Sequence, residues 1–249
     1  MSKSEWTTGK SSREGENDMS STLVLIPGLL SDERVWRPLE GALPGVDIHR
    51  ADVTKDDTIE AMAFRALSAF EGYCTVVGHS MGGRVAMEVA RQAPQRVAKL
   101  VLSNTGDHPV KPGEKENRQA RVDQGHADFP AMIEDWLPPM VAASRHNDVG
   151  LISNLTEMAH SIGPIVHERQ ITALVSRPDA SAYLPELACP ILLIAGTEDI
   201  WSPVAQHRDM QTRARNATLR VVENGGHFLP VERARMTTRL IVDWLLLAH

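Results

Sequence analysis

The sequence predicts an α/β fold in which a mostly parallel sheet is flanked by helices. Two observations carry this prediction: short β-branched apolar runs alternate with helical segments, and one such run passes through a sharp glycine-flanked turn directly into a helix. With 249 residues, of which 42% are hydrophobic, the chain can bury one full core and hold an inserted subdomain. The net charge of −6, with both signs interspersed, argues against a nucleic-acid-binding protein, which would show a clustered basic face.

The two ends of the chain differ in character. Residues 1–20 are rich in Ser, Lys, Glu, Gly and Asn, and they lack the apolar stretch that a signal peptide needs. We expect this segment to be disordered or to be a tag, outside the fold. The apolar run 240–247 is far shorter than the roughly 20 residues of a membrane span and predicts a C-terminal core helix.

Strands and helices follow one another in the order expected for a parallel sheet. Residues 22–26 predict a buried first strand that ends in a Pro-Gly turn signal. Residues 46–53 predict a second strand, residues 59–70 a helix, and residues 97–102 a strand that follows the glycine-flanked turn and its helix. This alternation is typical of strands joined by crossover helices.

The most informative segment is the strand, turn and helix around Ser80. β-branched and aromatic residues precede the Gly-x-Ser-x-Gly motif at 78–82, and helix formers follow it until Pro94. A serine held in a strained, positive-φ turn brings its flanking residues so close together that only glycine fits at Gly78 and Gly82. The pattern predicts an exposed nucleophile, a nucleophile elbow, whereas the alternative is a serine that merely begins a helix.

A nucleophilic serine needs a base and a carboxylate, and both are predicted to follow strands near the C-terminus. The apolar run 190–195 leads to Asp199, and the short β run 219–222 leads to His227 in a glycine-flanked loop. Because ligands bind outside the carboxyl ends of parallel strands, we expect Ser80, Asp199 and His227 to meet at one edge of the sheet. Their order along the chain is the one expected for this architecture.

Two other acids compete with Asp199 for the role of the carboxylate. Glu198 is its neighbour, but the side chains of adjacent residues usually point apart. Asp107 follows the strand at 97–102 and is the more serious rival, because some folds of this kind place the acid there. Separate Asn substitutions of the two aspartates distinguish the two assignments.

An oxyanion hole needs two backbone N–H donors close to the serine. Met81, directly after the nucleophile, is the first predicted donor. Leu29 is the second, because it follows the first strand in a loop where Gly28 permits a turn.

The long stretch between the strands at 97–102 and 190–195 departs from this alternation. Several of its segments carry apolar residues at helical spacing, and prolines separate them. Because so long a loop without structure would be unusual, we expect a helical cap over the serine. The predicted organisation is a core at 21–106 and 185–249 with the cap at 107–184.

Aromatic side chains near the predicted site are candidates for a substrate pocket. Trp201 closely follows Asp199, Trp136 lies on the apolar face of the expected cap, and Phe228 follows His227. A purely structural role is the alternative for each of the three.

Cys74 and Cys189 each begin a predicted buried strand, with another strand between these two. They would then lie too far apart to form a disulfide. We therefore expect two buried free thiols and a cytoplasmic location.

Four ordered motifs resemble the α/β-hydrolase family, and the resemblance covers most of residues 21–248. More narrowly, the chain is similar to small cap-bearing carboxylesterases of the kind that includes pimeloyl-acyl-carrier methyl ester esterase. The resemblance implies that Ser80, Asp199 and His227 have the roles argued above. The motifs are 25–29 with Trp36, 78–83, 196–199 and 226–228.

Two features depart from that family pattern. Pro27 precedes Gly28 at the first loop, where the family usually has His-Gly, so the shape of the oxyanion loop differs. The chain also begins at what resembles the third strand of the family, so the customary leading hairpin is expected to be absent.

Taken together, the residues and the resemblance predict a serine hydrolase that cleaves a carboxylic ester of a small or medium-sized substrate through an acyl-enzyme. The same triad suits a lactonase, a thioesterase or a C–C bond hydrolase, although the last often has Trp where Phe228 stands. A ligand receptor on a hydrolase scaffold is the alternative from another class. We expect no cofactor and no metal site, a small-molecule acyl substrate, and neither nucleic acid nor membrane as a partner.

Overall fold

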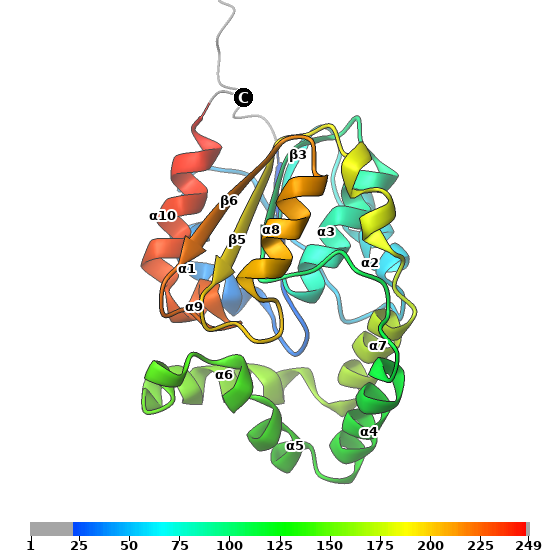
Figure 1. The fold of residues 1–249 in the computed structure, drawn as a ribbon, viewed down its shortest axis with the longest axis vertical. Coiled ribbons are helices and arrows are strands. Elements are labelled where there is room, and N and C mark those ends of the chain that lie inside the picture. The colour runs from blue at the N-terminus through cyan, green and yellow to red at the C-terminus, as the bar shows by residue number, and fades with distance from the viewer. Residues whose placement is uncertain (1–21, 248–249) are drawn as a thin grey trace, which may run out of the picture.

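A single sheet of six strands forms the centre of the molecule (Figure 1). The computed structural model describes residues 22–247, so the segment 1–20, expected to be disordered, lies outside the described residues. The strand order is β2-β1-β3-β4-β5-β6 and every neighbouring pair is parallel, which confirms the predicted fold class. The strands are β1 (Thr22–Ile26), β2 (Ile48–Arg50), β3 (Cys74–His79), β4 (Val97–Ser103), β5 (Ile191–Gly196) and β6 (Ala217–Val222).

The central strands are buried along most of their length. Every residue of β1, β3 and β5 is buried, as expected for apolar strands that are covered on both faces of a parallel sheet. In the register of the sheet, Gly78 at the end of β3 lies between Ile26 of β1 and Leu102 of β4. The turn that follows β3 therefore leaves from the middle of the carboxyl edge of the sheet.

Strand β2 is shorter than the sequence predicts, because only residues 48–50 of the expected 46–53 join the sheet. The carboxylate of Asp52 accepts hydrogen bonds from the backbone N–H and the hydroxyl of Thr54, at 2.9 and 2.6 Å. This local turn directs the chain away from β1.

Helices cover both faces of the sheet (Figure 1). Helices α2 (Ile59–Ser68), α3 (Met81–Gln92) and α8 (Val204–Arg213) lie on one face, and α1 (Arg37–Gly41) and α10 (Ala234–Leu245) lie on the other. Their buried side chains belong to two separate apolar clusters, one on each face. The shorter turns are α9 (Leu229–Glu232), η1 (Glu33–Val35), η2 (Pro138–Met140), η3 (Ala143–Arg145), η4 (Ala180–Ala182) and η5 (Leu184–Glu186).

Four helices between β4 and β5 lie beyond the carboxyl ends of the strands (Figure 1). The side chains of Asp128 and Asp148 cap two of them by accepting a hydrogen bond from the backbone N–H three residues later, and Pro164 begins a third. They are α4 (Glu114–Ala127), α5 (Phe129–Trp136), α6 (Val149–Ile162) and α7 (Pro164–Val175). The division of the chain into a core and a cap stays a prediction.

Across residues 22–247, no helix combines the length and the apolar character that crossing a membrane requires.

Candidate active site

The turn between β3 and α3 holds Ser80 in a conformation that few residues adopt. Its φ is 55° and its ψ is −117°. A Cβ at Gly78 would collide with the backbone of Gly82, and a Cβ at Gly82 would collide with the carbonyls of Ile26 and Pro27. The close approach of these backbones explains why glycine stands on both sides of the serine.

Three side chains from three loops meet at this edge of the sheet. The Oγ of Ser80 lies 2.7 Å from Nε2 of His227, and Nδ1 of His227 lies 2.9 Å from Oδ2 of Asp199. His227 and Asp199 are both buried, at 7% and 3% exposure. When Nδ1 donates its proton to Asp199, Nε2 is left to accept the proton of the Ser80 hydroxyl.

The carboxylate of Asp199 has a hydrogen-bond partner on each oxygen besides the histidine. Oδ1 accepts from the backbone N–H groups of Trp201 and Ser202, both at 2.9 Å, and Oδ2 accepts from Nδ2 of Asn104 at 2.8 Å. Burial alone would raise the pKa of Asp199, but the nearby charge of His227 and these hydrogen bonds lower it well below its ordinary value. The carboxylate therefore stays ionised beside the imidazole.

Asn104 is part of the site although the sequence analysis did not single it out. It follows β4 with a φ of 51°, and its side-chain amide also donates to the carbonyl of Gly226 at 3.1 Å. The side-chain oxygen Oδ1 of Asn104 accepts a hydrogen bond from the hydroxyl of Ser103 at 2.8 Å. The available signal was a polar residue directly after a buried strand of the same sheet.

The two rival acids lie in other interactions. The carboxylate of Asp107, which is 1% exposed, forms an ion pair with Arg213. The carboxylate of Glu198 accepts a hydrogen bond from the backbone N–H of Ala143 at 2.9 Å. Of the three candidate acids, Asp199 is the one that the structure brings to His227.

The backbone of His227 is held at both its N–H and its C=O. The N–H donates to the carbonyl of Met140 at 2.8 Å, and the C=O accepts from Nε2 of His79 at 2.7 Å. Burial and the nearby charge of His227 lower the pKa of His79 to about 3, so His79 is uncharged and serves as a donor.

A buried carboxylate joins the histidine loop to the chain between α5 and α6. Glu232 is 3% exposed, and its Oε2 accepts from the backbone N–H of Ala142 at 2.8 Å and of Gly226 at 3.1 Å. Burial raises the pKa of Glu232, although these backbone hydrogen bonds oppose the effect. Sequence reasoning missed this residue, because its partners come from segments far apart along the chain.

Ser80 and His227 face a cavity of about 470 Å³. Trp136 and Phe228 are almost fully buried in its wall, and their rings meet edge to face at 5.9 Å between centroids. Trp201 is half exposed at its mouth. All five predicted oxyanion and pocket residues line this cavity: Leu29, Met81, Trp136, Trp201 and Phe228.

The two residues expected to form an oxyanion hole, Met81 and Leu29, line the same cavity as Ser80. Within residues 22–247, neither Met81 nor Leu29 donates its N–H to a protein acceptor. The loop that carries Leu29 is fixed by the next residue, because the N–H of Leu30 donates to Oε1 of Gln170 in α7 at 3.0 Å. Both N–H groups are thus available to a ligand in the cavity.

In the part of the chain that the structure describes, no group of three or more His, Cys, Asp or Glu side chains is placed to hold a metal ion.

Comparison with known proteins matches residues 23–239 to a family described as the Alpha/beta hydrolase family. The chain belongs to this family. Among its relatives, a putative carbamate hydrolase, RutD, from Stutzerimonas stutzeri is 25% identical, and the alignment covers 90% of this chain and 91% of the relative. This α/β hydrolase therefore spans nearly the whole length of such relatives.

Two solved structures are similar to this hydrolase in fold. A thermophilic esterase from Thermogutta terrifontis, described as malate bound, has a TM-score of 0.83 with 26% identity, covering 90% of this chain and 89% of that one. The enol-lactonase from Burkholderia xenovorans LB400 has a TM-score of 0.81 with 21% identity, covering 94% of this chain and 93% of that one, a likeness that shows the fold alone.

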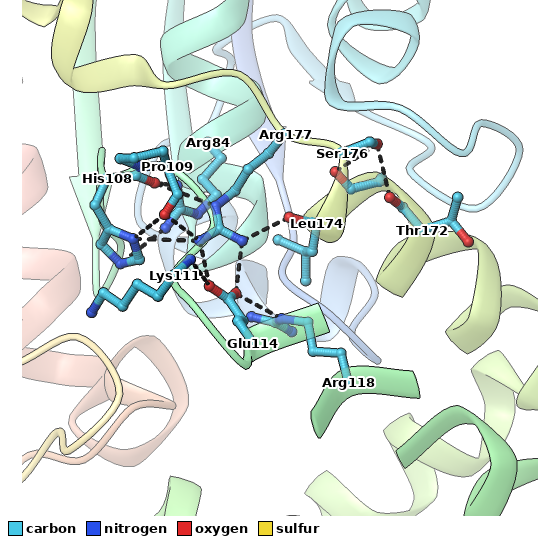
Figure 2. A network of polar contacts seen from close by, with 11 residues as sticks. Arg84, His108, Pro109, Lys111, Glu114, Arg118, Thr172, Leu174, Ser176 and Arg177 are labelled. Atoms are coloured by element: carbon cyan, nitrogen blue, oxygen red, sulfur yellow. Dashed lines mark hydrogen bonds and ion pairs between the residues drawn. The ribbon is translucent and has the colours of Figure 1, made fainter. Parts of the chain in front are cut away.

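The cavity of this α/β hydrolase also has a charged end, which the sequence analysis did not predict. Arg118 and Arg177 pair with the carboxylate of Glu114, and Arg84 lies beside Arg177 and donates to His108; we call Arg84, Glu114, Arg118 and Arg177 the cationic cluster (Figure 2). Arg177 donates to both oxygens of Glu114 at 2.7 and 2.8 Å, and Nε of Arg118 donates to one of them at 2.8 Å. Arg84, Arg118 and Glu114 line the same cavity as Ser80.

The charges of the cationic cluster influence one another strongly. Burial lowers the pKa of Arg84 to about 9, and the charge of Arg177 acts in the same direction. Burial alone would raise the pKa of Glu114, but its hydrogen bonds with Arg177 and Arg118 lower it well below its ordinary value. Arg84 could have been suspected from the sequence, since it lies in the first turn of the helix that follows Ser80.

Proposed function

We propose that this α/β hydrolase is a serine esterase that cleaves a carboxylic ester through an acyl-enzyme. The observation that carries the proposal is the continuous chain of hydrogen bonds from Ser80 through His227 to Asp199 at the wall of the cavity. A serine becomes an effective nucleophile when a positioned imidazole takes its proton and a carboxylate orients that imidazole.

In the first half of the reaction, Nε2 of His227 accepts the Ser80 proton while Oγ attacks the ester carbonyl. The N–H groups of Met81 and Leu29 stabilise the negative oxygen of the tetrahedral intermediate. Asp199 stabilises the imidazolium, which then gives its proton to the departing alcohol. The acyl group remains on Ser80.

In the second half, His227 removes a proton from a water molecule that attacks the acyl-enzyme. The same two N–H groups hold the second oxyanion, and the imidazolium returns its proton to Ser80 as the acid leaves. Each step uses side chains and backbone groups of this chain together with water.

The relatives support a reaction at a carbonyl group. The Thermogutta terrifontis esterase and the putative carbamate hydrolase are named for substrates that contain a carbonyl carbon, an ester and a carbamate. A cavity of about 470 Å³ suits a small or medium-sized substrate. Within this class we place carboxylic esters first, and lactones and thioesters are the comparison substrates.

The direct test is Ser80→Ala, assayed with p-nitrophenyl butyrate and by labelling with a fluorophosphonate probe. We expect kcat to fall by at least about 10⁴-fold and labelling to disappear. Ser153→Ala, which removes an exposed hydroxyl on α6, is the matched control and should keep both activities. Turnover and labelling that persist in Ser80→Ala would show that this serine is not the nucleophile. In the wild-type chain, a single burst of product followed by stalled turnover would favour a ligand receptor over an enzyme.

A cytoplasmic location belongs to the same proposal. Cys74 and Cys189 are free cysteines, and burial raises the pKa of both thiols to about 11. Unpaired thiols are typical of a reducing compartment. Cell fractionation that finds the chain in a secreted fraction would contradict this location.

A further inference from the structure

We propose that the cavity selects esters that carry a carboxylate group close to the ester, and that the cationic cluster binds this carboxylate. The inference rests on the proposed esterase function and adds a substrate class to it. It is drawn from the charges and the unpaired polar groups at the end of the cavity away from Asp199.

Positive charge exceeds negative charge at this end of the cavity. The cationic cluster has three guanidinium groups and the single carboxylate of Glu114, which pairs with Arg118 and Arg177 and not with Arg84 (Figure 2). Asp107, whose charge also acts on Arg84, is engaged in an ion pair with Arg213. Lys111 and Arg121 add two further cationic side chains to the cavity wall.

Arg84 is the guanidinium with the poorest set of partners. It donates to the carbonyl of His108 at 3.0 Å and lies 3.3 Å from Nε2 of the same residue, and both of these acceptors are neutral. A guanidinium taken out of water without a carboxylate partner is costly, and the lowered pKa of Arg84 reflects this cost. A bound carboxylate offsets it, because two oxygens fit the forked donors of an arginine.

A second unpaired group lies in the same wall. His167 is 1% exposed, and neither of its ring nitrogens has a hydrogen-bond partner within the described chain. Burial lowers its pKa to about 4, so the ring is neutral and offers one N–H donor and one acceptor. Buried polar atoms in native proteins are nearly always paired, so an imidazole without a protein partner in a cavity wall is open to a hydrogen bond with a ligand or a water molecule.

The position of Arg84 limits the distance between the two functional groups of the substrate. Ser80 is the N-cap of α3 and Arg84 lies in its first turn, where the backbone N–H of Arg84 donates to the carbonyl of Ser80 at 3.4 Å, and both residues line the cavity. A guanidinium that extends from this position reaches a carboxylate only a few bonds from the carbonyl that Ser80 attacks. Half-esters of short dicarboxylic acids and esters of short hydroxy acids have this arrangement.

The experiment compares charged and neutral esters of equal length on the wild-type chain. Monomethyl succinate, glutarate and adipate are each compared with the methyl ester of the alkanoic acid of the same chain length. Carboxymethyl butanoate and ethyl butanoate form a second pair, in which the carboxylate lies on the alcohol side. We expect at least one charged ester to have a kcat/KM about 10-fold or more above that of its neutral partner, and the two sets show on which side the carboxylate lies.

Arg84→Gln and Arg118→Gln test the residues. In each variant we expect the ratio of charged to neutral kcat/KM to fall about 10- to 100-fold. Arg239→Gln, which removes an exposed arginine on α10, is the matched control and should keep the wild-type ratio. Arg118 is less central than Arg84, so its variant keeps the test usable if Arg84→Gln does not fold.

A binding measurement gives a readout without turnover. Glutarate and adipate should raise the melting temperature of Ser80→Ala, and adding Arg84→Gln or Arg118→Gln should abolish the increase. Neutral esters that are hydrolysed as fast as their charged partners, together with ratios that the arginine variants leave unchanged, would overturn this inference but not the esterase proposal. Failure to hydrolyse any ester would instead overturn the proposed function.

Discussion

The two ends of the cavity differ in how completely their polar groups are paired. At the Asp199 end, both carboxylate oxygens, both ring nitrogens of His227 and the Ser80 hydroxyl have partners within the chain. At the Arg84 end, two of three guanidinium groups pair with one carboxylate, Arg84 has no carboxylate partner, and His167 has no partner among the described residues. The first end is organised before any substrate arrives, whereas the second is completed by a ligand.

The two ends also differ in their origin along the chain. Ser80, Asp199 and His227 each follow a strand, so the sheet alone brings them to one edge. The residues of the cationic cluster come from α3, α4 and the segment after α7, so they meet only after the inserted helices have packed.

The largest expected effect separates Asp199 from its rival. Asp199→Asn should lower kcat for a neutral ester by about 10⁴-fold, because the imidazole loses both its orientation and the stabilisation of its positive charge. Asp107→Asn should leave kcat within about threefold, since its carboxylate pairs with Arg213 rather than with His227. If Asp107→Asn abolished turnover and Asp199→Asn did not, Asp107 in the loop after β4 would be the catalytic acid.

The next test probes the backbone contacts beneath the serine. In Gly82→Ala, the new methyl group meets the carbonyls of Ile26 and Pro27, and we expect the free energy of unfolding to fall by about 3 kcal/mol or more. Gly41→Ala is the matched control, because nothing lies within 4 Å of a Cβ there, and its effect should stay within about 0.5 kcal/mol. Urea denaturation of the two variants measures both values. Equal effects would contradict the close contact between position 82 and the carbonyls of Ile26 and Pro27.

A third test concerns the cationic cluster alone. Glu114→Gln leaves Arg118 and Arg177 without their carboxylate partner, and we expect the free energy of unfolding to fall by about 1–3 kcal/mol at pH 7. Because the pKa of Glu114 is lowered in the folded chain, its stabilising effect is complete above the ordinary value of 4.5 and is lost as the pH falls below it. Urea denaturation of both proteins between pH 7 and pH 3 should show the difference between them shrinking, and a difference independent of pH would contradict this explanation.

The smallest effect is expected at the mouth of the cavity. Trp201 is 50% exposed, so Trp201→Ala should raise KM by about two- to threefold and leave the melting temperature unchanged. Steady-state kinetics on a neutral ester checks the first value, and a large fall in kcat would show that the ring also holds the neighbouring acid in place.

The sequence predicted the fold class and singled out the three side chains that the structure brings together. Both followed from local patterns: apolar strands, a glycine-flanked turn, and polar residues directly after strands. Their catalytic roles stay a proposal. The sequence did not predict the early end of β2, because side-chain hydrogen bonds of Asp52 override the strand pattern there.

Asn104, Glu232 and the cationic cluster were missed for a different reason. Each acts through partners that are distant in sequence, such as the contact of Asn104 with Asp199 or that of Arg177 with Glu114. No periodicity or spacing encodes such a contact, since it exists only after tertiary packing. Substrate preference is therefore harder to predict from this chain than reaction type.

The segment between α5 and α6 is fastened directly to the loop that carries His227. The carbonyl of Met140 accepts the N–H of His227, and Glu232 accepts from the N–H groups of both Ala142 and Gly226. Because Met140 also lines the cavity, one wall of the cavity and the backbone of the histidine form a single hydrogen-bonded unit.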